Sequence, residues 1–140
     1  MQILTKLNLK QVRALAAGLA YKHKDKDFSL GLSGSLGSGK TTFIKAFAAA
    51  LGIKKIASPT FIIMSAFSLP GKRRLYHLDL YRITKLDELD ALGLGEILAS
   101  RRRIVVVEWI DKFPKLAKKC NMLIHLDIVN QSKRNVHIMP

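Results

Sequence analysis

The stretch from Gly34 to Thr41 constrains the fold of this chain more than any other part of it. It reads Gly-Ser-Leu-Gly-Ser-Gly-Lys-Thr, which fits the pattern G-x-x-x-x-G-K-[ST] of a phosphate-binding P-loop. Glycines let the backbone curl so that successive N–H groups point at one anion. A helix that follows the loop offers its N-terminal N–H groups and the positive end of its dipole to the same phosphates. The pattern therefore predicts a strand, a loop and a helix, in that order.

The residues on either side of the loop agree with this prediction. Residues 28–33 are short and apolar enough for a buried strand, and residues 41–51 form an alanine-rich helical pattern closed by Gly52. A tight turn without a ligand is the less favoured alternative, because strand, loop and helix come in the order that phosphate binding needs. Lys40 is expected to reach the outer phosphates, and the Thr41 hydroxyl to bind Mg²⁺. The loop residues expected to bind a nucleotide are Gly37, Ser38, Gly39, Lys40 and Thr41.

Length and composition indicate one domain over residues 1–140 with a basic surface. The chain has 140 residues and a formal net charge of +14, from 24 Lys and Arg against ten Asp and Glu. Such a surface attracts polyanions, so a tRNA or an acidic protein face is a natural partner, although the charge can also serve solubility alone. Cys120 is the only cysteine, which excludes an internal disulfide and suits a reducing cytosol. Neither a membrane-spanning run nor a signal peptide is recognised, so we expect a cytoplasmic location and no membrane partner.

The remaining chain alternates between strand and helix patterns. Asn8 can cap a first helix, and Thr84 can cap a later one that Gly93 and Gly95 break into short pieces. The apolar run Ile104–Val107 is typical of a central strand covered on both faces. Together these patterns predict an α/β, three-layer P-loop NTPase fold with a central, mostly parallel sheet plus antiparallel strands. The other expected strands are residues 60–67 and 74–79, which form a hairpin, and residues 122–128 and 136–139.

Two acids are candidates to hold Mg²⁺ beside the P-loop. Glu108 directly follows Ile104–Val107 and Asp79 ends residues 74–79, so both should project from the carboxyl ends of strands, where ligands bind in such sheets. Either acid can hold the metal or polarise an attacking water, and either can also be an ordinary exposed acid. Asp90 matches the D-x-x-G of GTP-binding switches, but no strand precedes it. A GTPase is disfavoured further because no N-K-x-D motif is present.

Several motifs in order resemble one known family. The loop is similar to G-D-L-G-A-G-K-T-T-F, and Ser58-Pro-Thr-Phe61 is similar to S-P-T-[FY]. His77-Leu-Asp-Leu-Tyr-Arg82 resembles H-x-D-L-Y-R, and Glu88 to Gly93 and Glu108-Trp109 match later elements. On these motifs the chain resembles TsaE (formerly YjeE), the bacterial ATPase family of tRNA threonylcarbamoyladenosine biosynthesis.

The resemblance implies a function and further site residues. Members are cytoplasmic ATPases with slow activity of their own, which act with TsaB and TsaD while a threonylcarbamoyl group is transferred to an adenosine beside the anticodon. It implies that Lys40, Asp79 and Glu108 are catalytic and that Thr41, Asp79 and Glu108 bind the metal. Thr42 and Trp109 would lie beside the nucleotide, which is ATP or ADP with Mg²⁺. Residues 58–61 resemble a switch segment near the γ-phosphate, and tRNA would be met through the complex.

Some features depart from this pattern or fit other functions. Ser35 stands where the family usually has Asp, and Ser38 stands where Ala is common. His77 and Trp109 can equally be core residues. Lys133 and Arg134 lie in a turn that can approach the nucleotide, although a solvated turn is the favoured interpretation. The alternatives are a small-molecule kinase, a nucleotide-gated binding module that barely hydrolyses ATP, and a plain basic RNA-binding domain.

Overall fold

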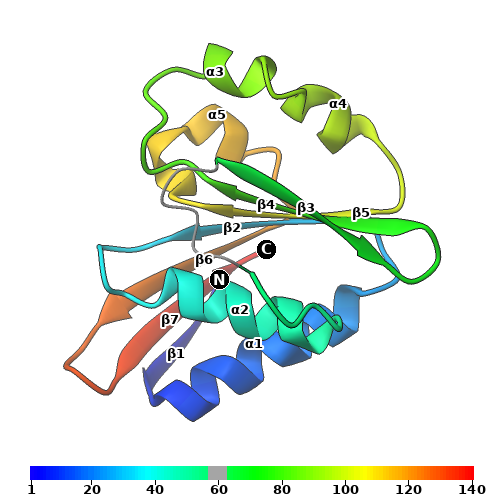
Figure 1. The fold of residues 1–140 in the computed structure, drawn as a ribbon. Coiled ribbons are helices and arrows are strands. Elements are labelled where there is room, and N and C mark those ends of the chain that lie inside the picture. The colour runs from blue at the N-terminus through cyan, green and yellow to red at the C-terminus, as the bar shows by residue number, and fades with distance from the viewer. Residues whose placement is uncertain (57–62) are drawn as a thin grey trace.

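A seven-stranded sheet runs through the middle of the protein in a computed structural model, which describes residues 1–56 and 63–140 (Figure 1). The strand order is β1-β7-β6-β2-β5-β4-β3. The strands are β1 (Gln2–Leu7), β2 (Phe28–Ser33), β3 (Met64–Leu69), β4 (Arg73–Asp79), β5 (Arg103–Glu108), β6 (Met122–Ile128) and β7 (Arg134–Met139).

The centre of the sheet is parallel and its edges are antiparallel. β2 pairs in parallel with β5 and β6, and β5 pairs in parallel with β4. β3, β7 and β1 add antiparallel pairs at the two edges. Ile104 to Val107 of β5 are at most 1% exposed, as expected for a strand covered on both faces. The predicted fold class is confirmed.

Helices form a layer on each face of the sheet (Figure 1). α1 (Leu9–His23) and α2 (Lys40–Ala50) pack on one face through buried side chains such as Val12 and Phe43. The other face is covered by α3 (Asp87–Asp90), α4 (Leu94–Ala99), the 3₁₀ helix η1 (Ile110–Lys112) and α5 (Pro114–Ala117). Period-two alternation assigns Val106 of β5 to the first core and Val105 to the second.

The N-terminal region contains both a confirmed prediction and a missed strand. Asn8 caps α1 as expected, since its Oδ1 accepts from the Gln11 N–H at 2.8 Å while its own N–H donates to Gln11 Oε1 at 2.9 Å. β1 was not predicted, because its exposed, mixed side chains show no apolar face. It forms by pairing with β7, Gln2 opposite Ile138, so the two termini lie side by side (Figure 1).

The predicted hairpin is present, with altered bounds. β3 pairs with β4 from Met64 opposite Leu78 to Leu69 opposite Arg73. The predicted start of this strand and the switch-like motif at residues 58–61 fall outside the described residues. The expected cap at Thr84 is wrong: α3 begins at Asp87, and the Thr84 hydroxyl donates to Glu88 Oε1 at 2.9 Å instead. Across the described ranges, no helix combines the length and apolarity that a bilayer crossing requires.

Candidate nucleotide-binding site

The carboxyl ends of β2, β5 and β4 meet at one edge of the sheet, and the candidate site lies there. The strand register sets Leu32 of β2 opposite Glu108 of β5, and Glu108 opposite Asp79 of β4. Ligands bind at this edge in open α/β sheets. The structure therefore brings the two predicted acids together next to the end of the P-loop strand.

The P-loop backbone depends on its glycines. Gly34 has φ +140°, and a Cβ at this position would lie 2.5 Å from the Leu126 carbonyl oxygen and 2.6 Å from Ser38 Oγ. Any other residue would have to displace backbone here, so the curl of the loop requires glycine. The loop leads directly into α2, whose N-terminus is not capped by a side chain from the described residues. Its first N–H groups are thus left for an anion.

Lys40 is almost fully buried, with 5% of its surface exposed. Its ammonium donates to the carbonyl oxygens of Gly34 at 2.6 Å and Ser35 at 3.0 Å. It also lies 3.9 Å from the centre of the Trp109 ring, a cation–π contact. Burial lowers the pKa of Lys40, while the carboxylates of Glu108, Asp111 and Asp79 oppose that shift. The partners of this cation are thus neutral carbonyl oxygens and an aromatic ring, and none of the three is an anion.

Glu108 is buried and accepts two hydrogen bonds. Its Oε1 accepts from the Thr41 hydroxyl at 2.9 Å, and its Oε2 lies 2.7 Å from His77 Nε2. Glu108 is 2% exposed. Asp79 lies beside it and accepts the Tyr81 N–H at 3.0 Å. Burial raises the pKa of Asp79, the Tyr81 N–H lowers it, and the charge of Glu108 raises it further.

These residues line one cavity of about 340 Å³. Trp109 forms part of its wall with a left-handed backbone, φ +61°, and its ring lies 5.1 Å from the Tyr81 ring. Such backbone conformations are uncommon outside glycine and concentrate at functional sites. Every predicted site residue lines this cavity except Ser38, which lies on the other side of the loop. The lining residues are Leu36, Gly37, Gly39, Lys40, Thr41, Thr42, Asp79, Tyr81, Glu108 and Trp109.

Comparison with known proteins assigns the family. Residues 7–136 match the family model described as "Threonylcarbamoyl adenosine biosynthesis protein TsaE". The chain belongs to the TsaE family. It is 36% identical over 110 residues to a TsaE protein of Aquifex aeolicus, covering 76% of this chain and 73% of that protein. A Bacillus subtilis TsaE protein is 42% identical over 104 residues, covering 74% and 63%. The crystal structure of Bacillus subtilis YdiB superposes with a TM-score of 0.66 at 28% identity, covering 96% of this chain and 82% of that one.

His77, for which a core position and a site position were equally expected, belongs to the site. It is fully buried, and its Nε2 contacts Glu108. A carboxylate only accepts hydrogen bonds, so Nε2 carries the proton and donates. Within the described residues Nδ1 has no hydrogen-bond partner. The alternation of side chains along a strand could have predicted this position. His77 and Asp79 share one face of β4, and Asp79 is opposite Glu108.

Arg134 contacts the P-loop, so the favoured expectation of a solvated turn is wrong for this residue. It opens β7, and its guanidinium donates from Nε to the Ser38 carbonyl at 2.9 Å and from Nη2 to the Gly37 carbonyl at 3.2 Å. Nη1 donates to the Asn130 carbonyl at 2.7 Å. Arg134 therefore clamps the outer side of this TsaE P-loop to the β6–β7 turn. A cavity of about 220 Å³ opens between them, lined by Leu9, Val12, Gly37, Ser38, Gly39, Thr42, Gln131, Ser132 and Arg134.

The donor set of the first cavity fits Mg²⁺ held together with a nucleotide. Mg²⁺ prefers oxygen ligands and uses one or two carboxylates plus phosphate and water oxygens. Thr41, Glu108 and Asp79 supply a hydroxyl and two carboxylates along the same wall. Residues 1–56 and 63–140 contain no group of three or more His, Cys, Asp or Glu that could hold a metal alone. The site suits a phosphate-bound cation better than a metal centre made of protein ligands only.

Proposed function

We propose that the protein is a Mg²⁺-dependent ATPase that supports threonylcarbamoylation of an adenosine beside the tRNA anticodon, acting with TsaB and TsaD. One observation carries the ATPase: the P-loop threonine and a buried strand-end glutamate are in contact, Thr41 Oγ1 to Glu108 Oε1 at 2.9 Å. That contact sets the metal-binding hydroxyl of a P-loop against an acid at the next strand end, the arrangement used for phosphoryl transfer. The pathway is supported by the names of the TsaE relatives.

The residues of the chain would act as follows. The loop amides and the first turn of α2 bind the phosphates, and Lys40 exchanges its carbonyl contacts for phosphate oxygens. His77 holds one oxygen of Glu108, so the other oxygen is directed at the cavity to orient a water and accept its proton. Mg²⁺, when bound, would neutralise charge on the phosphate oxygens.

The base of the nucleotide would occupy the second cavity. It lies on the side of the P-loop away from Asp79 and Glu108, toward α1 and the β6–β7 turn. Leu9 and Val12 offer apolar contact, and Gln131 and Ser132 offer polar groups to a base edge. The phosphates would then run from this cavity over Gly37 to Gly39 into the first one. Both cavities share Gly37, Gly39 and Thr42, which supports a single elongated ligand.

The test is phosphate release from ATP with Mg²⁺ or with EDTA, in the presence and absence of TsaB, TsaD and tRNA. We expect hydrolysis to require Mg²⁺ and to rise with the partners. Glu108→Gln should lower kcat about 100-fold or more, a typical loss for a general base. It should leave ADP binding intact, measured by fluorescence of Trp109, the only tryptophan. Glu96→Gln, which changes an exposed acid on α4, should have no effect.

Two results would contradict the proposal. An unchanged rate in Glu108→Gln with all partners present would favour a nucleotide-gated binding module instead. Transfer of the γ-phosphate to a metabolite, detected as a phosphorylated acceptor rather than free phosphate, would favour a kinase.

A further inference from the structure

Three basic loops meet at the end of the sheet opposite the nucleotide site, where β2, β4 and β5 begin. They are residues 22–27, 70–74 and 101–103, and we call them together the basic end. Hydrogen bonds join them: the Arg73 guanidinium donates to the Lys26 carbonyl, and the Arg103 N–H donates to Asp27 Oδ1 at 3.2 Å. The Arg74 N–H donates to the Arg102 carbonyl at 3.0 Å. The basic end is thus one connected surface built from three distant parts of the sequence.

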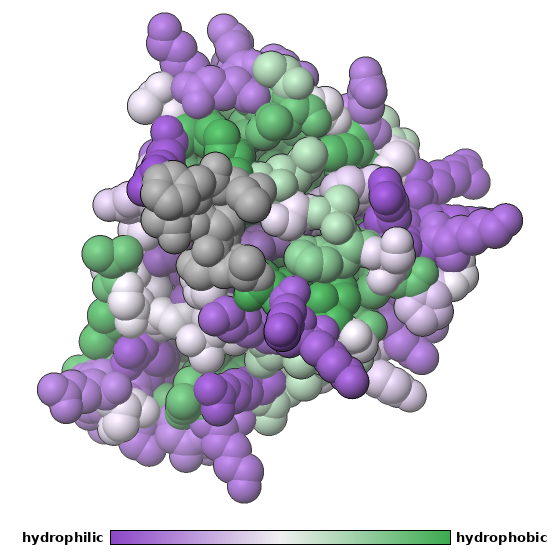
Figure 2. Space-filling model, viewed as in Figure 1, coloured by the Kyte–Doolittle hydropathy of each residue, from purple (hydrophilic) through white to green (hydrophobic). Residues whose placement is uncertain are grey.

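The positive charge of the protein is concentrated there. The basic end holds nine Lys and Arg against two acids, so 14 residues carry half of the net charge of +14. Figure 2 shows hydrophilic side chains projecting from this end, at the right of the view. The exposed bases are Lys22, Lys24, Lys26, Lys72, Arg74, Arg101 and Arg102. Such a density of one sign raises the local concentration of polyanions.

Most of these charged side chains are not needed for hydrogen bonds or ion pairs within the described part of the protein. Arg73 and Arg103 donate to backbone carbonyls and so hold the scaffold. Lys24 lies 3.9 Å from Asp25, a weak exposed pair. In the described part of the chain, the side chains of Lys72, Arg101 and Arg102 make no hydrogen bond or ion pair. Their charges repel one another, and a polyanion bound across the three loops would relieve that repulsion.

An exposed aromatic side chain at the edge of the basic end favours RNA over an acidic protein as the partner. Tyr21 is 70% exposed in the last turns of α1. The Lys24 ammonium lies 4.9 Å from the centre of its ring. Aromatic rings among basic side chains serve as stacking platforms for unpaired bases, while lysines and arginines contact the phosphates. An acidic protein surface would need the charges but not the exposed ring.

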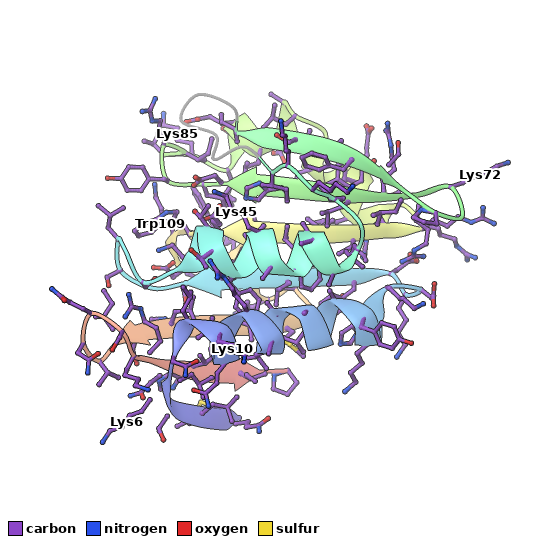
Figure 3. The ribbon with its side chains drawn as sticks, turned by 60° about the horizontal axis from the view of Figure 1, so that its bottom comes forward. Lys6, Lys10, Lys45, Lys72, Lys85 and Trp109 are labelled. Carbon is purple, nitrogen blue, oxygen red and sulfur yellow. The ribbon has the colours of Figure 1, made fainter. Side chains whose placement is uncertain are left out.

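We propose that the basic end binds the phosphate backbone of an RNA and that Tyr21 stacks on one of its unpaired bases. Figure 3 shows Lys72 and Trp109 at opposite ends of the molecule, so RNA and nucleotide can be bound together. This interaction goes beyond the proposed ATPase and does not depend on hydrolysis, because the two sites share no residue. It gives the chain a direct contact with RNA, in addition to any contact made by its partners.

The test compares two variants with the same loss of charge, using fluorescence anisotropy with labelled tRNA over a range of salt. One variant combines Lys72→Gln, Arg74→Gln, Arg101→Gln and Arg102→Gln. The matched control combines Lys6→Gln, Lys10→Gln, Lys45→Gln and Lys85→Gln, all exposed and outside the basic end (Figure 3). The basic-end variant should lose at least about tenfold in affinity, and its log–log salt slope should fall by roughly 3. The control should lose about threefold or less.

A single substitution tests the stacking. Tyr21→Ala should weaken binding to tRNA by about fivefold or more, as expected for one stacked base, and leave binding to fully paired duplex RNA unchanged. Equal losses in both four-site variants, or no measurable tRNA binding by the wild type, would overturn the proposal. So would binding of poly-glutamate as tight as that of tRNA and unaffected by Tyr21→Ala, which would identify an acidic-protein dock. ATP hydrolysis without RNA should be unchanged in every variant. The hydrolysis assay therefore tests the ATPase proposal independently of the RNA-binding proposal.

Discussion

The two ends of the parallel strands use charge in opposite ways. At the nucleotide end Lys40 and Glu108 are 5% and 2% exposed, and each has fixed partners. At the basic end, residues such as Lys72 and Arg102 project into solvent from turns where both have a positive φ. The same three strands thus end in a few buried charges and begin with many exposed ones.

This difference determines what each charge can do. A buried charge acts in a low effective dielectric and at fixed geometry, so one atom can contribute several kcal/mol to a reaction step. An exposed charge is screened within about 8–10 Å at physiological salt, so many are needed for modest affinity. We therefore expect single substitutions to have large effects at the nucleotide end, whereas the basic end should respond only to combined ones.

The largest effect is expected for Lys40→Ala. The loop would lose its buried cation, and ATP hydrolysis should fall at least about 100-fold in kcat/KM, a typical loss for one electrostatic contact in a dry site. Lys45→Ala, an exposed lysine on α2, is the control and should change the rate less than about twofold. Both are measured as phosphate release at saturating Mg²⁺. Similar losses in the two variants would remove the contrast between buried and exposed charge.

The nucleotide end could be predicted largely because its signals are local in sequence. The loop, β2 and α2 are contiguous, Glu108 directly follows an apolar β-branched run, and Asp79 ends a predicted strand. The contacts that the sequence did not reveal are distant: His77 meets Glu108 across 31 positions, and Arg134 meets Ser38 across 96. No local pattern encodes such pairs. β1 was missed for the same reason, since it exists only through pairing with β7.

His77 tests whether position, rather than charge alone, makes the nucleotide end effective. His77→Leu should free one oxygen of Glu108 and leave it without its buried donor, so kcat should fall about 10- to 100-fold. The KM for ATP should change little, because His77 does not line the cavity. His77→Gln offers an amide N–H near Nε2 and should recover most of the loss.

Steady-state kinetics of these two variants separates positioning from folding. If His77 only stabilised the fold, the Leu and Gln variants would lose activity because less of each protein is folded, and their Tm values would fall. If both variants have the Tm of the wild type and also hydrolyse ATP as fast as the wild type, His77 does not position Glu108. In that case the nucleotide end would depend on charge alone, as the basic end does.

Arg134 allows a smaller test, because its charged side chain is only partly buried and, among residues 1–56 and 63–140, donates only to carbonyl oxygens. Arg134→Ala would release the P-loop from the β6–β7 turn. We expect the KM for ATP to rise about fivefold, equivalent to roughly one hydrogen bond to a charged group, with kcat nearly unchanged. Lys133→Ala, at the neighbouring position, should leave both constants unchanged. A fall in kcat with constant KM would show that Arg134 acts on the reaction step instead.

The smallest expected effect is on thermal stability. It is a gain, whereas the substitutions above are expected to cause losses of activity. Burial raises the pKa of Asp79 above its ordinary value, so at neutral pH the folded state keeps a carboxylate charged at a cost. Asp79→Asn should therefore stabilise the nucleotide-free protein slightly, by about 1–3 °C in Tm at pH 7. The Asn amide oxygen can still accept the Tyr81 N–H, so that hydrogen bond need not be lost.

The pH dependence of this gain follows from linkage. A raised pKa means that the folded state binds the proton more tightly, so the penalty on Asp79 is present at neutral pH and disappears as the pH falls toward about 4. The Tm difference between Asp79→Asn and the wild type should shrink over that range, measured by thermal melts in EDTA. Asp90→Asn, an exposed acid on α3, should show no such convergence. A destabilised Asp79→Asn at pH 7 would mean that the carboxylate is a net favourable charge in the folded protein, as expected for an exposed charge rather than for a partly buried one.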